Sequence, residues 1–147
     1  MPLQYVLDTN VLVAAFRSQK GASRKLLLSA LDRDIVVLVS VPLMFEYEAV
    51  LTRKDQLEAS GLSGVETNAV LDAFVAVATP VNFRFLWRPQ LRDPADEMVL
   101  ETAVNGGADR LVTFNLRHFS QAASNFAIIT AAPPDAWKDI LSLNEKK

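Results

Sequence analysis

The most constraining feature of the chain is an unbroken apolar run, Ile-Val-Val-Leu-Val, at residues 35–39. A strand in which apolar and polar residues alternate can leave one face in water, but this run needs cover on both faces. Strands of parallel sheets have that environment, because the helices that connect them pack on the sheet. The run therefore predicts a central parallel sheet with helices on both sides.

Strand and helix patterns alternate along the rest of the chain, in the order expected for such a sheet. With 147 residues, half of them hydrophobic, we expect a single α/β domain that spans residues 1–147. Strands are predicted at residues 3–7, 35–39, 81–85, 110–113 and 126–130. Helices are predicted at residues 11–16, 23–32, 42–53, 63–78 and 94–105, with a last one from Pro133 or Pro134 to Leu143.

The composition excludes several classes of site. The chain has no cysteine and one histidine, His118, which excludes disulfides, thiol catalysis and zinc sites built from several Cys or His side chains. A net charge of −2 lacks the basic balance typical of nucleic-acid binders, so any such contact must use a local patch. No apolar run is long enough to span a bilayer, and the N-terminal segment is a poor signal peptide. We therefore expect a soluble cytoplasmic protein.

Carboxylates follow the predicted strands or lie early in the helices that come next. Asp8 follows the first strand, and Glu46 and Glu48 lie in the helix after the second. Each has a structural explanation, because Asp8 can cap a helix and a glutamate can lie on a solvated helix edge. Asp96 continues the apolar stripe of its helix and so points toward the sheet, whereas Asp93 is the better candidate for the cap of that helix.

These positions are expected to converge, because ligands of parallel sheets bind beyond the carboxyl ends of the strands. Carboxylates brought together repel each other, so either one has a raised pKa or a cation is bound. Oxygen ligands alone indicate Mg²⁺ or Mn²⁺, which activates water and stabilises the leaving oxygen of a phosphate-bearing substrate. Spacing does not separate Glu46 from Glu48. Thr113 and Asn115, after the fourth strand, could position water or metal at the same edge.

Three segments, "VLDTNVLVAA", "SVPLMFE" and "RDPADEMVLETAVNGGADRLVTFNLRHF", resemble in order and spacing the PIN domains, especially the toxin-like bacterial PIN proteins. The resemblance covers residues 3 to about 130. It implies a three-layer α/β/α sandwich with a parallel sheet of about five strands. It also implies an endoribonuclease that needs Mg²⁺ or Mn²⁺ and acts as the VapC-like toxin of a type II toxin–antitoxin system. The implied partners are RNA as substrate, a separate antitoxin protein and a second copy in a homodimer.

By position, the resemblance assigns the metal ligands to Asp8, Glu46 and Asp96, and prefers Glu46 over Glu48. The fourth polar position of the catalytic set is often Asp in this family and is Asn115 here. That departure removes a negative charge, which favours a site with one metal ion and low activity. The expected supporting residues are Thr9, Thr113 and Asp93.

Basic side chains near this edge could hold RNA phosphates, although solvated surface is the ordinary role of each one alone. Phe83 and Trp87 could stack on bases, although core packing is the more common role of such rings. The alternative hypothesis is a weak or inactive PIN domain that serves as a binding scaffold and binds no Mn²⁺. The expected RNA-binding residues are Arg17, Arg92, Arg117 and His118.

Overall fold

Five parallel strands form one sheet in the order β3-β2-β1-β4-β5, so β1 lies at the centre. The structure, a computed structural model, describes residues 2–84, 91 and 93–145. The parallel sheet confirms the prediction drawn from the apolar run. The strands are β1 (Gln4–Leu7), β2 (Val36–Ser40), β3 (Thr79–Val81), β4 (Arg110–Val112) and β5 (Ile129–Ala131).

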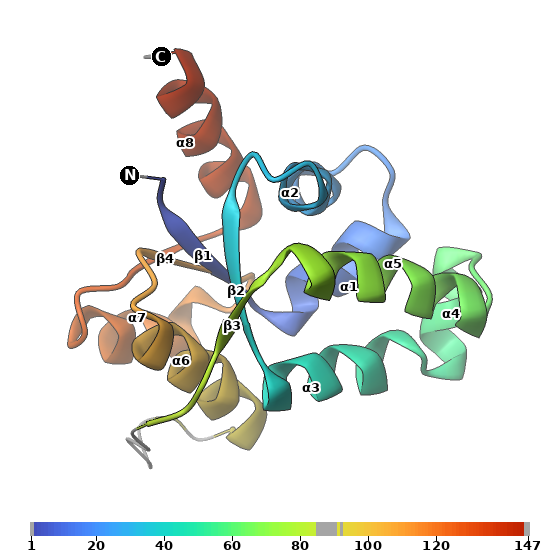
Figure 1. Cartoon of the computed structure of the whole chain (residues 1–147), viewed down its shortest axis with the longest axis horizontal. Helices are drawn as coiled ribbons and strands as arrows, with labels where there is room; N and C mark the ends of the chain where they lie inside the picture. The colour runs from blue at the N-terminus through green and yellow to red at the C-terminus, as the bar shows by residue number, and fades with distance from the viewer. Residues whose placement is uncertain (1, 85–90, 92, 146–147) are drawn as a thin grey trace.

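Helices cover both faces of the sheet and give the three-layer α/β/α arrangement (Figure 1). In that view α6 and α7 lie on one side of the strands, and α1, α2, α3 and α5 lie on the other. The strands run downward, so their carboxyl ends are at the bottom, while α8 and the N-terminus are at the top. The helices are α1 (Thr9–Arg17), α2 (Ala22–Leu31), α3 (Val41–Leu51), α4 (Lys54–Ser60), α5 (Gly64–Val77), α6 (Pro94–Gly106), α7 (Leu116–Ser124) and α8 (Pro133–Glu145).

The apolar run at residues 35–39 is enclosed as its composition requires. Val37 and Leu38 are each 1% exposed, and Ile35 and Val39 are also buried. The two central residues of β1, Tyr5 and Val6, are buried in the same core. Among the described residues, no helix is long enough and apolar enough to cross a membrane.

Two helices of the structure were not predicted from the sequence, α4 and α7. In α4 the only buried residue is Gln56, so the helix has no apolar stripe that could reveal it. In α7 the buried residues are Phe119, Ala122 and Ala123, and Asn115 at its start forms no side-chain capping bond. The third strand was predicted at residues 81–85, of which residue 85 lies outside the described residues, but β3 covers Thr79–Val81 and pairs through Pro80 with Val39 of β2. A proline is tolerated there because β3 is an edge strand.

The end of α6 approaches the sheet closely at Gly106. A Cβ atom at this position would lie 2.8 Å from Leu38 Cδ1 and 2.8 Å from Val81 Cγ2. Real Cβ atoms do not approach other atoms so closely, so glycine lets α6 pack against β2 and β3. The next residue, Gly107, ends the helix with a φ of 67°, which suits glycine.

We expect Gly106→Ala to lower the free energy of unfolding by about 1–3 kcal/mol, because the added methyl group overpacks the core. Urea unfolding followed by circular dichroism measures this difference. Gly64→Ala is the matched control, since a Cβ atom at Gly64 meets nothing within 4 Å. Equal stability of the two variants would contradict the close packing of α6 on the sheet.

Candidate metal centre

Asp8 lies where the central strand ends and the first helix begins. Its backbone N–H donates to the Val112 carbonyl at 2.9 Å, so the pairing of β1 with β4 extends to this residue. By its backbone angles Asp8 is the N-cap of α1, but its side chain forms no capping hydrogen bond. The carboxylate is therefore not used as a helix cap, although the sequence allowed that role.

The carboxylate of Asp8 is held by the turn after β4 instead. Its Oδ2 accepts a hydrogen bond from the Thr113 hydroxyl at 2.7 Å, and both side chains are buried. The same Thr113 oxygen accepts a bond from the backbone N–H of Asn115 at 2.9 Å. Thr113 thus fixes the orientation of Asp8 and the shape of the turn that carries Asn115.

Burial raises the pKa of Asp8 to about 6, from an ordinary value of 3.8. The hydrogen bond from Thr113 opposes this change, while the negative charge of Asp96 adds to it. The charge of Asp96 therefore acts on Asp8, although Asp8 follows β1 and Asp96 belongs to α6. We call Asp8 and Asp96 together the acidic site.

Asp96 lies in the first turn of α6 and is 8% exposed. The cap of this helix is Asp93, whose side chain accepts a hydrogen bond from the Ala95 N–H at 2.9 Å. Asp96 is left to interact with His118, because Nδ1 of that ring lies 3.1 Å from Asp96 Oδ2. Burial raises the pKa of Asp96, and the bond to His118 opposes that change.

Glu46 and Glu48 both lie on α3, and the structure brings neither into the acidic site. Glu46 is partly exposed and Glu48 is exposed. Neither forms a hydrogen bond or ion pair with Asp8 or Asp96 in the part of the chain that the structure describes. Within residues 2–84, 91 and 93–145, no three acidic, Cys or His side chains are grouped closely enough to hold a metal ion. The described residues therefore bring together two of the three predicted ligands.

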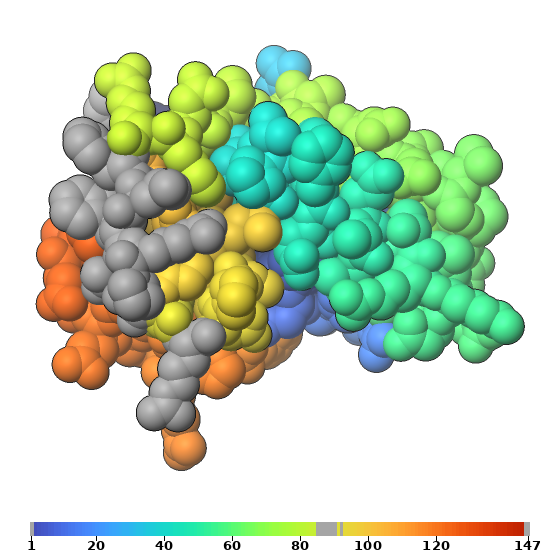
Figure 2. All heavy atoms as spheres, turned by 90° about the horizontal axis from the view of Figure 1, so that it is seen from below, coloured from blue at the N-terminus to red at the C-terminus, as the bar shows by residue number. Residues whose placement is uncertain are grey.

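The edge of the sheet at which the strands end lies between α3 and α6. Figure 2 views the molecule from this side, and a blue segment near the N-terminus lies between α3 in teal and the start of α6 in yellow. α3 thus borders the edge at which β1 ends and α6 begins. Glu46, in the second turn of α3, is on an element that reaches this edge.

Tyr47 connects α3 to the end of β1, a role that no local pattern in the sequence indicates. Its hydroxyl donates to the Leu7 carbonyl, in the residue that precedes Asp8. The pairing of β1 with β2 includes Gln4 and Tyr5 but not Leu7, so this carbonyl has no partner in β2. The Tyr47 ring is completely buried and packs edge-on against Phe74, with ring centres 6.0 Å apart. Tyr47 therefore supplies a hydrogen bond to the last residue of β1, directly before Asp8.

We expect Tyr47→Phe to lower the free energy of unfolding by about 1–3 kcal/mol, because the buried Leu7 carbonyl loses the hydrogen bond that Tyr47 donates. Tyr5→Phe makes the same chemical change on β1, where the hydroxyl has no hydrogen-bond partner among the described residues. Urea unfolding of both variants gives the comparison. A Tyr47→Phe protein as stable as Tyr5→Phe would show that the bond to Leu7 contributes nothing.

The other predicted site residues fall into three groups. Thr9 is buried at the start of α1, and Asn115, Arg117 and His118 are exposed around the turn after β4. Arg17 lies at the far end of α1, where its Nε donates to Gln56 Oε1 of α4 at 2.6 Å. Arg92 and Trp87 lie outside the described residues, and Phe83 is partly buried against the core.

The family model of the PIN domain matches residues 4–117. The chain belongs to the PIN domain family. No curated protein matches it. A solved structure with a similar fold is the crystal structure of VapBC2 from Rickettsia felis bound to a DNA fragment from their promoter. The TM-score is 0.60 at 17% sequence identity, and the match covers 88% of this chain and 98% of that chain. The PIN-like fold expected from the sequence is confirmed.

The acidic site of this PIN domain has the chemistry that a divalent cation requires. Asp8 and Asp96 supply carboxylate oxygens, which Mg²⁺ and Mn²⁺ prefer. Burial raises the pKa of both, so their charged forms are disfavoured in the protein without a cation. A bound cation would compensate their charges. The donor set therefore fits the metal that was expected from the sequence.

Proposed function

We propose that this PIN domain is a VapC-type endoribonuclease that depends on Mg²⁺ or Mn²⁺ and acts as the toxin of a type II toxin–antitoxin system. The observation that carries the proposal is a pair of buried carboxylates, Asp8 directly after β1 and Asp96 in α6, of which Asp96 raises the pKa of Asp8 through its charge. Burying two like charges is unfavourable unless an opposite charge, such as a bound cation, compensates them. Membership in the PIN family and the likeness in fold to a VapBC2 structure support the same activity.

In this proposal Asp8 and Asp96 hold the cation, and the third ligand is Glu46 of α3, which the family resemblance assigns and which the described residues do not group with the other two. The bound cation supplies positive charge that polarises the phosphodiester and offsets the charge developing on the leaving oxygen. Thr113 keeps Asp8 in one orientation through its bond to Oδ2. Asn115, exposed two residues after Thr113, positions water or substrate with its side-chain amide.

The proposed partners are RNA and an antitoxin protein on another chain. Arg117 and His118 are exposed on the first turn of α7, beside the acidic site, where their side chains can reach substrate phosphates. The similar fold comes from a crystal structure of VapBC2 with DNA, which supports an antitoxin as the protein partner. A homodimer and a cytoplasmic location belong to the same proposal and rest on the family resemblance.

The proposal is tested by incubating the purified protein with a mixed set of labelled RNAs, both structured and unstructured, in Mn²⁺ or in EDTA. We expect cleavage in Mn²⁺ and none in EDTA. Cleavage that persists in EDTA would contradict the role of the metal. Failure to cut any RNA, together with no binding of Mn²⁺, would favour a PIN domain that acts as a scaffold.

A further inference from the structure

Two exposed aromatic side chains lie next to the candidate catalytic residues in the chain. Phe45, which precedes Glu46, is 59% exposed, and Phe114, which precedes Asn115, is 50% exposed. In the part of the chain that the structure describes, no other Phe or Trp is exposed. We propose that Phe45 and Phe114 stack on unpaired nucleobases of the RNA, on the two sides of the acidic site. This inference rests on the nuclease function proposed above.

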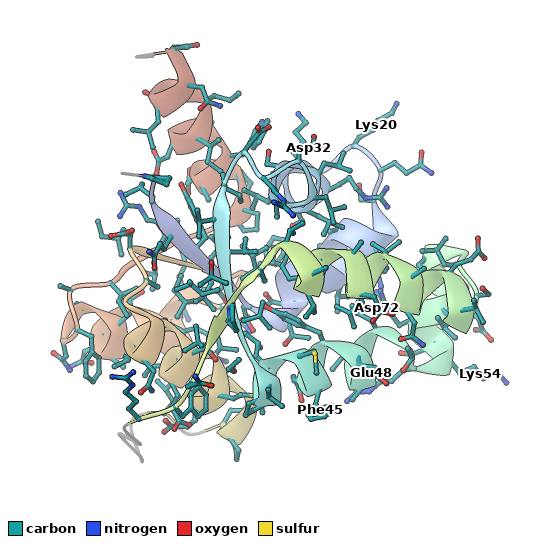
Figure 3. All side chains as sticks on the ribbon, viewed as in Figure 1. Lys20, Asp32, Phe45, Glu48, Lys54 and Asp72 are labelled. Atoms are coloured by element: carbon teal, nitrogen blue, oxygen red, sulfur yellow. The ribbon has the colours of Figure 1, made fainter. Side chains whose placement is uncertain are left out.

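The topology of the sheet places the two rings on opposite sides of Asp8. β1, which ends at Leu7 directly before Asp8, has β2 and β4 as its neighbours. Phe45 is in the helix that follows β2, and Phe114 is in the turn that follows β4. Neighbouring strands are about 4.8 Å apart, so β2 and β4 are separated by roughly 10 Å. Figure 3 shows Phe45 on the lower side of α3, toward the carboxyl ends of the strands.

The position of Phe114 is fixed by the bonds around it. Thr113 donates to Asp8 and accepts from the Asn115 N–H, so both neighbours of Phe114 take part in one hydrogen-bonded turn. The ring nevertheless stays half exposed. A single exposed apolar side chain is ordinary on a protein surface. Two exposed rings beside one acidic site are a basis for binding, because aromatic side chains stack on bases of any sequence.

The charge of the protein favours such a contribution. The net charge is only −2, so the protein as a whole does not attract a polyanion. Arg17, one of the expected phosphate contacts, is bonded to Gln56 instead. Electrostatic attraction to RNA is therefore weak, and base stacking supplies affinity that does not depend on charge. Stacking of this kind needs bases that are not paired, so the substrate is single-stranded RNA.

An interface with another protein would also cover exposed rings. RNA and a partner protein can be distinguished by the residue that replaces Phe. Leucine keeps the apolar contact that a protein interface needs but has no ring. Tryptophan keeps a ring that can stack. Base stacking therefore predicts that leucine variants lose RNA affinity and that tryptophan variants keep it.

The experiment uses Phe45→Leu, Phe114→Leu, the double leucine variant and the two tryptophan variants. Leu141→Ala is the control, because Leu141 is 44% exposed on α8, at the opposite end of the sheet (Figure 1). Binding of a fluorescent single-stranded 12-nucleotide RNA is measured by anisotropy, with Asp8→Asn added to every protein to prevent cleavage. KM and kcat for the same RNA in Mn²⁺ are measured without that substitution.

We expect each leucine variant to weaken binding and raise KM about 10-fold, and the double variant roughly 100-fold, with kcat little changed. The tryptophan variants and Leu141→Ala should bind as the parent protein does, and a duplex of the same sequence should bind more weakly to all. Leucine variants that bind and cleave like the parent would overturn the proposal. Leucine variants that change oligomeric state in light scattering, with no change in RNA affinity, would also overturn the proposal.

Failure of the proposed nuclease function can be distinguished from failure of the stacking proposal. A wild-type protein that cuts no RNA in Mn²⁺ contradicts the catalytic function, while the anisotropy measurement still reports on stacking. If the parent protein binds no single-stranded RNA, the stacking proposal is overturned even where cleavage of another substrate is observed.

Discussion

Asp8→Asn is expected to reduce RNA cleavage by at least about 100-fold and to leave the protein folded. The substitution removes one of the two carboxylates of the acidic site but keeps the size of the side chain. A catalytic cation contributes several kcal/mol to the stabilisation of the transition state, and each 1.36 kcal/mol corresponds to a tenfold change in rate. Asn can still accept the hydrogen bond that Thr113 donates to Oδ2, so the turn after β4 should persist.

Asp72→Asn is the matched control for this loss of activity. It makes the same chemical change at an exposed position on α5, labelled in Figure 3. We expect Asp72→Asn to cleave at the wild-type rate. Initial rates in Mn²⁺, with circular dichroism spectra to verify folding, give the comparison. Cleavage by Asp8→Asn at the rate of the control would show that Asp8 is not a catalytic residue.

The stability of the metal-free protein is expected to fall as pH rises from about 4 to about 6. The pKa of Asp8 is raised from 3.8 to about 6 in the folded protein, so the unfolded chain loses this proton first. Below both values the carboxyl is protonated in both states and has no effect. Above about pH 6 the folded state carries the whole cost of the buried charge. This cost is about 3 kcal/mol, from 1.36 kcal/mol for each pH unit between the two values.

Urea unfolding in EDTA at several pH values measures this cost as the difference between wild type and Asp8→Asn. The variant cannot ionise at this position, so we expect it to be the more stable protein at pH 7. Adding Mn²⁺ should then raise the stability of wild type much more than that of the variant, because a cation compensates the charge. A stability difference that does not vary with pH would contradict a raised pKa of Asp8.

The sheet could be predicted from the sequence because its signals are local. The apolar run at residues 35–39 requires cover on both faces, and the strand and helix patterns around it alternate. The helix α4 could not be predicted, since its single buried residue, Gln56, is polar and bonds to Arg17 of α1. Contacts of that kind depend on how the helices pack, and the spacing of residues within α4 does not indicate them.

The acidic site was only partly predictable, for the same reason. Asp8 and Asp96 could be identified because each occupies a strand end or a helix start that faces the carboxyl edge of the sheet. The contact of Asp96 with His118 joins residues 22 positions apart through the packing of α6 and α7. The bond of Tyr47 to Leu7 depends on the point at which β1 and β2 separate. The sequence carries no local sign of either contact.

The central claim is that the acidic site binds a divalent cation, and calorimetric titration of the purified protein with Mn²⁺ tests it most directly. The account predicts saturable binding to wild type and to Asp72→Asn, and a large loss of affinity in Asp8→Asn and in Asp96→Asn. Absence of saturable binding to wild type, or equal affinity in all four proteins, would contradict it.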